Sequence, residues 1–170
     1  RQPVTVGYDI YSPQGKLLEF NMQEVTIPGR STDTVRFTPF IYGTNANKWE
    51  PGAKNPPLYK VMLFTRRDGA YREYMPLKIG FGKTELVDGR LTRFDKELKL
   101  VKAGYNAAAD RKTTLAELKT LKAKGNNTIC PDYPQPGWFY DLCDELGLYV
   151  IDCANINACL LYTSPSPRDG

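Results

Sequence analysis

The sequence predicts a β-sandwich followed by the first strands and helices of a parallel α/β barrel. Apolar and polar residues alternate with a period of two through the first half of the chain, a pattern typical of strands with one buried face. Near Lys112 the spacing becomes helical, and strand-like and helical stretches then follow one another with short connections. We therefore expect antiparallel strands first and a parallel sheet afterwards.

Turn signals rich in glycine and proline separate the strands expected in the sandwich. The run 58–65 is apolar on both faces, which predicts a core strand that is covered on both sides. The other strand-like runs are 4–10, 18–22, 25–27, 35–42 and 71–81, with turns at Pro13 to Gly15, Pro28-Gly29 and Asp68-Gly69.

The second half opens with a hairpin and continues with helices. Asp88-Gly89 predicts a tight turn between strands that lie within 83–101. Thr114 and Glu117 form a capping-box signature, so we expect a helix to begin at Thr114 and to end at Gly125. Its basic residues lie opposite its leucines and predict a solvated face.

A strand, a helix and another strand are expected after this first helix. They are predicted at Thr128 to Cys130, at Trp138 to Leu146 before Gly147, and at Leu148 to Ile151. Short connections between such elements are typical of βαβ units, in which parallel strands are buried on both faces.

Composition excludes several classes of function. The net charge is +4 and basic residues are interspersed with acidic ones, so no nucleic-acid partner is predicted. Without a run of about 18 apolar residues, no membrane partner is predicted either. Histidine is absent and the four cysteines form no C-x-x-C pair, so we expect no metal site and no cofactor. Cys130, Cys143 and Cys153 lie in apolar runs and are interpreted as buried thiols.

The two ends of the sequence suggest an internal piece of a longer protein. Arg1 lies in a strand-like run without an initiator methionine or a signal-type segment. The tail from Cys159 to Gly170 shows no helical or strand pattern, so it is expected to be non-native or disordered.

Several short strings resemble glycoside hydrolase family 2, the family of β-galactosidases. The most specific string runs from Trp138 to Asp152 and is followed by Ala154-Asn155. Weaker matches are Gly80-Phe81-Gly82 and Gly104-Tyr105-Asn106. An earlier Trp-x-Pro...Pro-x-Leu-Tyr segment of the family is similar to Trp49, Pro51, Pro57, Leu58 and Tyr59.

The resemblance implies three segments and a function. It implies an immunoglobulin-like β-sandwich domain at 1–82 and the N-terminal part of a TIM (β/α)8 barrel at 83–158, which leaves the tail 159–170 outside both. The parent protein would hydrolyse O-glycosidic bonds in an oligosaccharide or β-galactoside. Its two catalytic glutamates would come from later barrel strands, so this chain would hold no catalytic residue and would itself be inactive.

Polar residues at the ends of the expected barrel strands are the candidates for binding sugar. Such ends carry the active sites of α/β barrels. Asp152 has an alternative role as a structural carboxylate, and Asn106 and Asn155 as turn caps. Trp138 and Trp49 are interpreted as packing residues. The candidates are Asn106, Asp132, Tyr133, Asp152 and Asn155.

Departures from the family pattern support a second hypothesis, a non-catalytic carbohydrate-binding or scaffold relative. The family's Arg-His is replaced by Ala107-Ala108, an arginine by Ile129 and a glutamate by Cys153. Further departures are Gly82 for an arginine, Asp132 for a histidine and Asn157 for a metal-binding glutamate. A third hypothesis is that the piece has no function alone, because its open sheet leaves strand edges and apolar faces uncovered.

Overall fold

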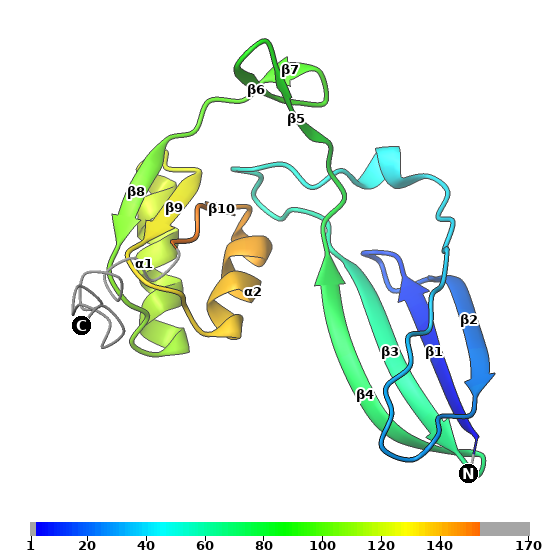
Figure 1. The fold of residues 1–170 in the computed structure, drawn as a ribbon. Helices are drawn as coiled ribbons and strands as arrows, with labels where there is room; N and C mark the ends of the chain where they lie inside the picture. Colours follow the sequence, from blue (N-terminus) through cyan, green and yellow to red (C-terminus); the bar gives the residue numbers. More distant parts are fainter. Residues whose placement is uncertain (1–2, 154–170) are drawn as a thin grey trace, which may run out of the picture. The chain divides into compact units, whose positions relative to one another are not determined.

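A computed structural model of the protein describes residues 3–153 (Figure 1). The chain divides into two compact units. Unit 1 comprises 1–49 and 57–82, and unit 2 comprises 50–56 and 83–170. Residues 50–56 therefore belong to unit 2 although they lie between two pieces of unit 1 in the sequence.

Unit 1 is built on one antiparallel sheet of four strands in the order β2-β1-β3-β4 (Figure 1). Its turns follow the sequence signals, since Asp68 and Gly69 both have positive φ values, 53° and 74°, where β3 turns into β4. The described residues of this unit form one sheet, whereas the predicted β-sandwich would have two. The strands are β1 (Val4–Tyr11), β2 (Leu17–Val25), β3 (Tyr59–Arg67) and β4 (Ala70–Ile79).

The core of unit 1 lies on one face of β1 and β3. Tyr8, Ile10 and Val61 are buried there, and Phe37 and Ile41 pack against them. Strand β3 is central and has buried residues on both faces, as expected for the core strand, but Leu63 is 36% exposed.

The segment that supplies Phe37 and Ile41 corrects one prediction, because 35–42 is not a strand. Pro39 lacks the amide that a sheet ladder needs, and it interrupts this run. Instead, Glu19 on β2 anchors the segment: one carboxylate oxygen accepts from the Phe40 amide (2.9 Å) and the other accepts from the Tyr8 hydroxyl (2.9 Å). The segment covers the core without pairing to the sheet.

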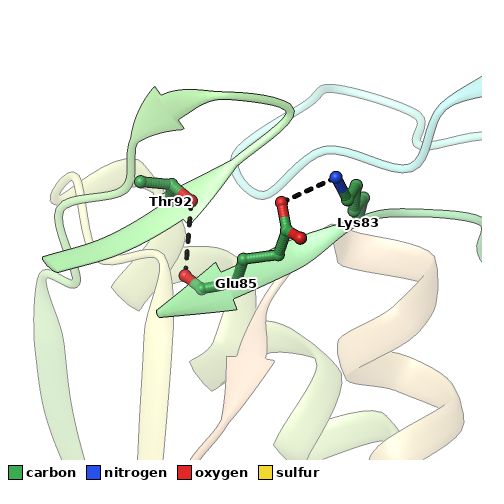
Figure 2. A network of polar contacts seen from close by, with 3 residues as sticks. All are labelled: Lys83, Glu85 and Thr92. Atoms are coloured by element: carbon green, nitrogen blue, oxygen red, sulfur yellow. Dashed lines mark hydrogen bonds and ion pairs between the residues drawn. The ribbon is translucent and has the colours of Figure 1, made fainter. Parts of the chain in front are cut away.

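In unit 2, a small antiparallel sheet comes first, formed by β5 (Thr84–Val87), β6 (Arg90–Arg93) and β7 (Lys96–Glu97). Asp88 and Gly89 have φ values of 48° and 76°, which confirms the predicted hairpin turn. Figure 2 shows the polar contacts that accompany the β5–β6 pairing. The Lys83 ammonium lies 2.8 Å from the Glu85 carboxylate, and the Thr92 hydroxyl donates to the Glu85 carbonyl at 3.3 Å.

Strands β8 (Lys102–Tyr105), β9 (Thr128–Pro131) and β10 (Tyr149–Val150) form a parallel sheet in the order β10-β9-β8. Both strand pairs are parallel, which confirms the predicted parallel sheet. Helix α1 (Arg111–Ala123) connects β8 to β9, and α2 (Gly137–Leu146) connects β9 to β10.

Apolar side chains from the two helices and the sheet form the core of unit 2. Leu118, Ile129 and Phe139 have no measurable exposure, and Leu142, Cys143 and Leu148 are buried with them. Gly147 ends α2 with a φ of 71°, and Gly125 follows α1 with a φ of 91°, as the sequence predicts.

The start of α1 corrects the predicted capping box. Asp110 is the N-cap, and its carboxylate accepts from the amides of Lys112 (2.9 Å) and Thr113 (3.0 Å). Hydrogen bonds from the side chain and the amide of Thr113, and then from the Lys112 amide, lower the pKa of Asp110. Thr114 lies inside the helix and is fully buried. A carboxylate accepts these amide hydrogens well, so the helix begins one turn before the predicted Thr114.

Residues 50–56 form a strap against the end of α2. The Gly52 amide donates to the Gly147 carbonyl at 2.7 Å. Lys122, on the predicted solvated face of α1, is only partly exposed, and its ammonium donates to the carbonyls of Ala53 and Leu146, the latter at 2.6 Å. The basic face of α1 is otherwise exposed at Lys112, Lys119 and Lys124.

Candidate functional site

Three loops that follow β8, β9 and β10 define the candidate site. Because these strands are parallel and adjacent, their carboxyl ends lie at the same edge of the sheet. Asn106 follows β8, Asp132 and Tyr133 follow β9, and Asp152 follows β10, all with exposed side chains. Asn155 lies outside the described residues.

Gln135 joins the loop after β8 to the loop after β9. Its side-chain oxygen accepts from the Ala108 amide at 2.8 Å, and its side-chain nitrogen donates to the Tyr133 carbonyl at 2.6 Å. The Asp132 amide also donates to the Tyr105 carbonyl at 2.9 Å, which extends the β8–β9 pairing into the loops.

Tyr140, on the first turns of α2, joins these loops to the one after β10. Its hydroxyl accepts from the Gln135 amide at 3.0 Å and donates to the Asp152 carboxylate at 2.8 Å. The Gln135 amide lowers the pKa of Tyr140, but burial and the Asp152 carboxylate together outweigh it, so the pKa is raised. The phenol therefore stays protonated and remains a donor to Asp152 at neutral pH.

Sequence reasoning missed Gln135 and Tyr140. Gln135 lies between two prolines in a loop and belongs to no periodic pattern. Tyr140 packs partly against the core beside Phe139, Leu142 and Cys143, so its helical spacing did not distinguish it from a packing residue.

A second feature lies between β8 and α1, where an open pocket of about 520 Å³ is lined in part by Tyr105, Asn106 and Glu117. The Tyr105 hydroxyl lies 2.5 Å from the Glu117 carboxylate, to which it donates, and 3.4 Å from the Thr114 hydroxyl. Burial, followed by the Glu117 contact, raises the pKa of Tyr105. The pocket borders the candidate site at Asn106.

The other residues considered from the sequence have structural positions. Trp138 packs against the core of unit 2, and Trp49 is 6% exposed with its ring over Gly80, which confirms both as packing residues. Cys143 is buried as predicted, but Cys130 and Cys153 are partly exposed, so the prediction is wrong for these two. They lie at or beyond the ends of short strands, where less of the chain covers them.

The described part of the chain holds no group of three or more metal-ligating side chains. Within residues 3–153, no helix is both long and apolar enough to cross a membrane.

Comparison with known proteins identifies the class of protein. Residues 104–165 match the family model described as the TIM barrel domain of glycosyl hydrolases family 2. The chain is 33% identical over 116 residues to a β-galactosidase of Lactobacillus delbrueckii subsp. bulgaricus, covering 62% of this chain and 11% of that protein. It is 32% identical over 152 residues to a β-galactosidase of Pseudoalteromonas haloplanktis, covering 83% of this chain and 14% of that protein.

Solved structures show the same fold. A β-glucuronidase of Parabacteroides merdae superposes with a TM-score of 0.72 at 23% identity, covering 88% of this chain and 20% of that one. A glycosyl hydrolase family 2 member of Bacteroides cellulosilyticus superposes with a TM-score of 0.71 at 20% identity, covering 89% of this chain and 22% of that one. The fold of this chain is therefore shared with these solved structures.

Within that class, the chain belongs to glycoside hydrolase family 2 and is similar to its β-galactosidases. It spans between about a tenth and a quarter of the length of the relatives compared above.

Proposed function

We propose that the chain is part of a family 2 glycosidase that hydrolyses O-glycosidic bonds in β-galactosides. The observation that carries this proposal is the match of 104–165 to the family's barrel domain, which covers the parallel sheet from β8 to β10. Relatives with about a third of their aligned residues identical are named β-galactosidases.

In this proposal the chain contributes two domains. Within the predicted range 1–82, residues 1–49 and 57–82 form an immunoglobulin-like domain, to which the sheet β2-β1-β3-β4 belongs. Residues 83–158, together with 50–56, form the first part of the TIM barrel, and 159–170 lie outside the described residues. The catalytic glutamates come from outside this chain, so this chain alone is inactive.

The residues proposed to bind sugar are polar groups at the carboxyl ends of the parallel strands. Carboxylates accept hydrogen bonds from sugar hydroxyls, and amide side chains both accept from them and donate to them. Exposure of Asn106, Asp132, Tyr133 and Asp152 leaves them accessible to such a ligand. Asn155 completes the proposed set from the sequence.

Hydrolysis of o-nitrophenyl β-D-galactoside by the complete protein tests the proposal. The matched control is the corresponding β-D-glucuronide, because structural relatives include β-glucuronidases. We expect turnover of the galactoside in preference to the glucuronide. Preferential turnover of the glucuronide would show that the proposed substrate class is wrong. No turnover of either compound would contradict the enzymatic function.

A non-catalytic carbohydrate-binding protein is the second candidate. Ala107-Ala108 and Cys153 stand where the family pattern has arginine, histidine and glutamate, which motivates this alternative. It predicts that the complete protein binds methyl β-D-galactopyranoside in calorimetry but releases no nitrophenol from the chromogenic substrate. Turnover in that assay excludes it.

A further inference from the structure

A continuous series of hydrogen bonds crosses all three loops of the candidate site. It runs from the Ala108 amide to the Gln135 side chain, from the Gln135 amide to the Tyr140 hydroxyl, and from that hydroxyl to Asp152. Each bond joins a different pair of elements within unit 2. The Gln135 and Tyr140 side chains therefore link the loops after β8, β9 and β10.

We propose that Gln135 and Tyr140 are the positioning residues of this site, which hold its three loops at fixed spacing for a β-galactoside. The inference rests on the proposed function for the identity of the ligand. Tyr140 orients Asp152 through one carboxylate oxygen, Oδ2, and Gln135 in turn orients Tyr140. Neither residue needs to contact the sugar.

The backbone around Gln135 suits this role. Pro134 and Pro136 each have a restricted φ, and a residue that precedes proline is held in the extended region. The Gln135 side chain therefore projects from a stiff segment, and little backbone conformational entropy is lost when it bonds to Ala108 and Tyr133.

Tyr140 likewise has little freedom. It lies on α2 directly after the fully buried Phe139, whose ring contacts the Tyr140 ring edge-on at 5.6 Å. A hydroxyl carried by a packed ring can fix the carboxylate with which it bonds. The exposed Asp152 is thereby held in one orientation before a ligand arrives, which is the usual benefit of preorganisation.

Amide hydrogen exchange of the ¹⁵N-labelled 170-residue chain tests the coupling. Tyr140→Phe removes no atom that contacts Ala108, yet we expect it to speed exchange of the Ala108 amide about fivefold, the effect of losing roughly 1 kcal/mol of hydrogen bonding. Gln135→Ala should speed it at least as much. Gln135→Glu keeps an acceptor for the Ala108 amide but loses the donor to the Tyr133 carbonyl, so exchange at Ala108 should be slower than in Gln135→Ala.

Tyr42→Phe is the matched control, because Tyr42 belongs to unit 1 and is 84% exposed. It should leave Ala108 exchange unchanged. Unchanged exchange in Tyr140→Phe as well would overturn the inference, as would unchanged exchange in Gln135→Ala.

Titration of the same samples with methyl β-D-galactopyranoside separates this inference from the proposed function. We expect ligand-dependent shifts at Asn106, Asp132 and Asp152, with affinity about fivefold weaker in Tyr140→Phe. Absence of any shift in the wild-type chain, with the exchange results as expected, would count against the proposed sugar and not against the linked loops. Equal affinity in wild type and Tyr140→Phe would overturn the positioning role.

Discussion

At the scale of single residues, Tyr105 shows how burial and one carboxylate set the behaviour of a side chain. Tyr105 is 9% exposed, and its hydroxyl donates to the Glu117 carboxylate. We expect Tyr105→Phe to lower the free energy of unfolding by about 1 kcal/mol at pH 8, because Glu117 loses this donor. Urea denaturation monitored by circular dichroism measures the difference.

The pKa of Tyr105 gives this prediction a pH dependence. A raised folded-state pKa means that the protonated phenol stabilises the fold fully below its ordinary value near 10, and that this stabilisation is lost as the pH rises above it. The difference between wild type and Tyr105→Phe should therefore shrink between pH 9 and pH 11. A constant difference across this range would contradict the assigned cause, and Tyr42→Phe serves as the exposed control.

Cys143 gives a second prediction at this scale. It is 1% exposed, and burial raises the pKa of its thiol to about 12, with a smaller contribution from Asp144. Only the thiolate reacts with iodoacetamide, so the folded chain should leave Cys143 unmodified at pH 8. Peptide mapping should instead find label first on Cys130 and Cys153, which are partly exposed. Early labelling of Cys143 would show that α2 opens readily.

At the scale of elements, Lys122 connects α1, α2 and the strap 50–56. Its ammonium donates to the carbonyls of Ala53 and Leu146, and burial lowers its pKa. Lys122→Met keeps most of the aliphatic stem but leaves two carbonyls without this donor. We expect a loss of about 1–3 kcal/mol in the free energy of unfolding, measured by urea denaturation.

Lys119→Met is the matched control, since Lys119 lies on the exposed face of the same helix. Its effect should stay within about 0.5 kcal/mol, as for most surface substitutions. Equal effects of the two substitutions would mean that the strap contributes nothing through Lys122.

Much of the secondary structure could be predicted because it depends on local chemistry. Asp68-Gly69 and Asp88-Gly89 turn as expected, since both residues of each pair have positive φ. The strand predicted at 35–42 does not form. Alternation of apolar and polar residues indicates a buried face, and Phe37 and Ile41 are indeed packed against the core, but a strand also needs a pairing partner.

Less of the candidate site could be predicted. The positions of Asn106, Asp132 and Asp152 follow from parallel strands, whose ends meet at one edge. The links through Gln135 and Tyr140 could not be predicted, because hydrogen bonds between loops depend on three-dimensional proximity and leave no periodic signal. Helical spacing likewise places Lys122 on the solvated face, because it does not reveal the carbonyls of Ala53 and Leu146 that accept its hydrogen bonds.

At the scale of the whole molecule, we expect an isolated piece that begins at Lys83 to aggregate or to remain molten. In the described structure β8 lies at the edge of its sheet, with β9 on one side only. Unpaired edges and exposed apolar groups promote association. The piece also lacks 50–56, and with it the bonds to Gly147 and Lys122.

Size-exclusion chromatography and thermal unfolding of this piece provide the measurement. The matched comparison is the full 170-residue chain, which retains the strap. A monomeric elution profile together with a cooperative melt for the shorter piece would show that these losses are tolerated.

The strap also determines how the chain can be divided. Since 50–56 belong to unit 2 while the flanking sequence belongs to unit 1, the polypeptide passes between the units more than once. A protease that cuts only after Gly82 would leave one covalent connection intact at each end of the strap. Any transplant of unit 2 into another protein must therefore carry two separate peptides, and a gene fusion that joins at Lys83 alone would deliver an incomplete module.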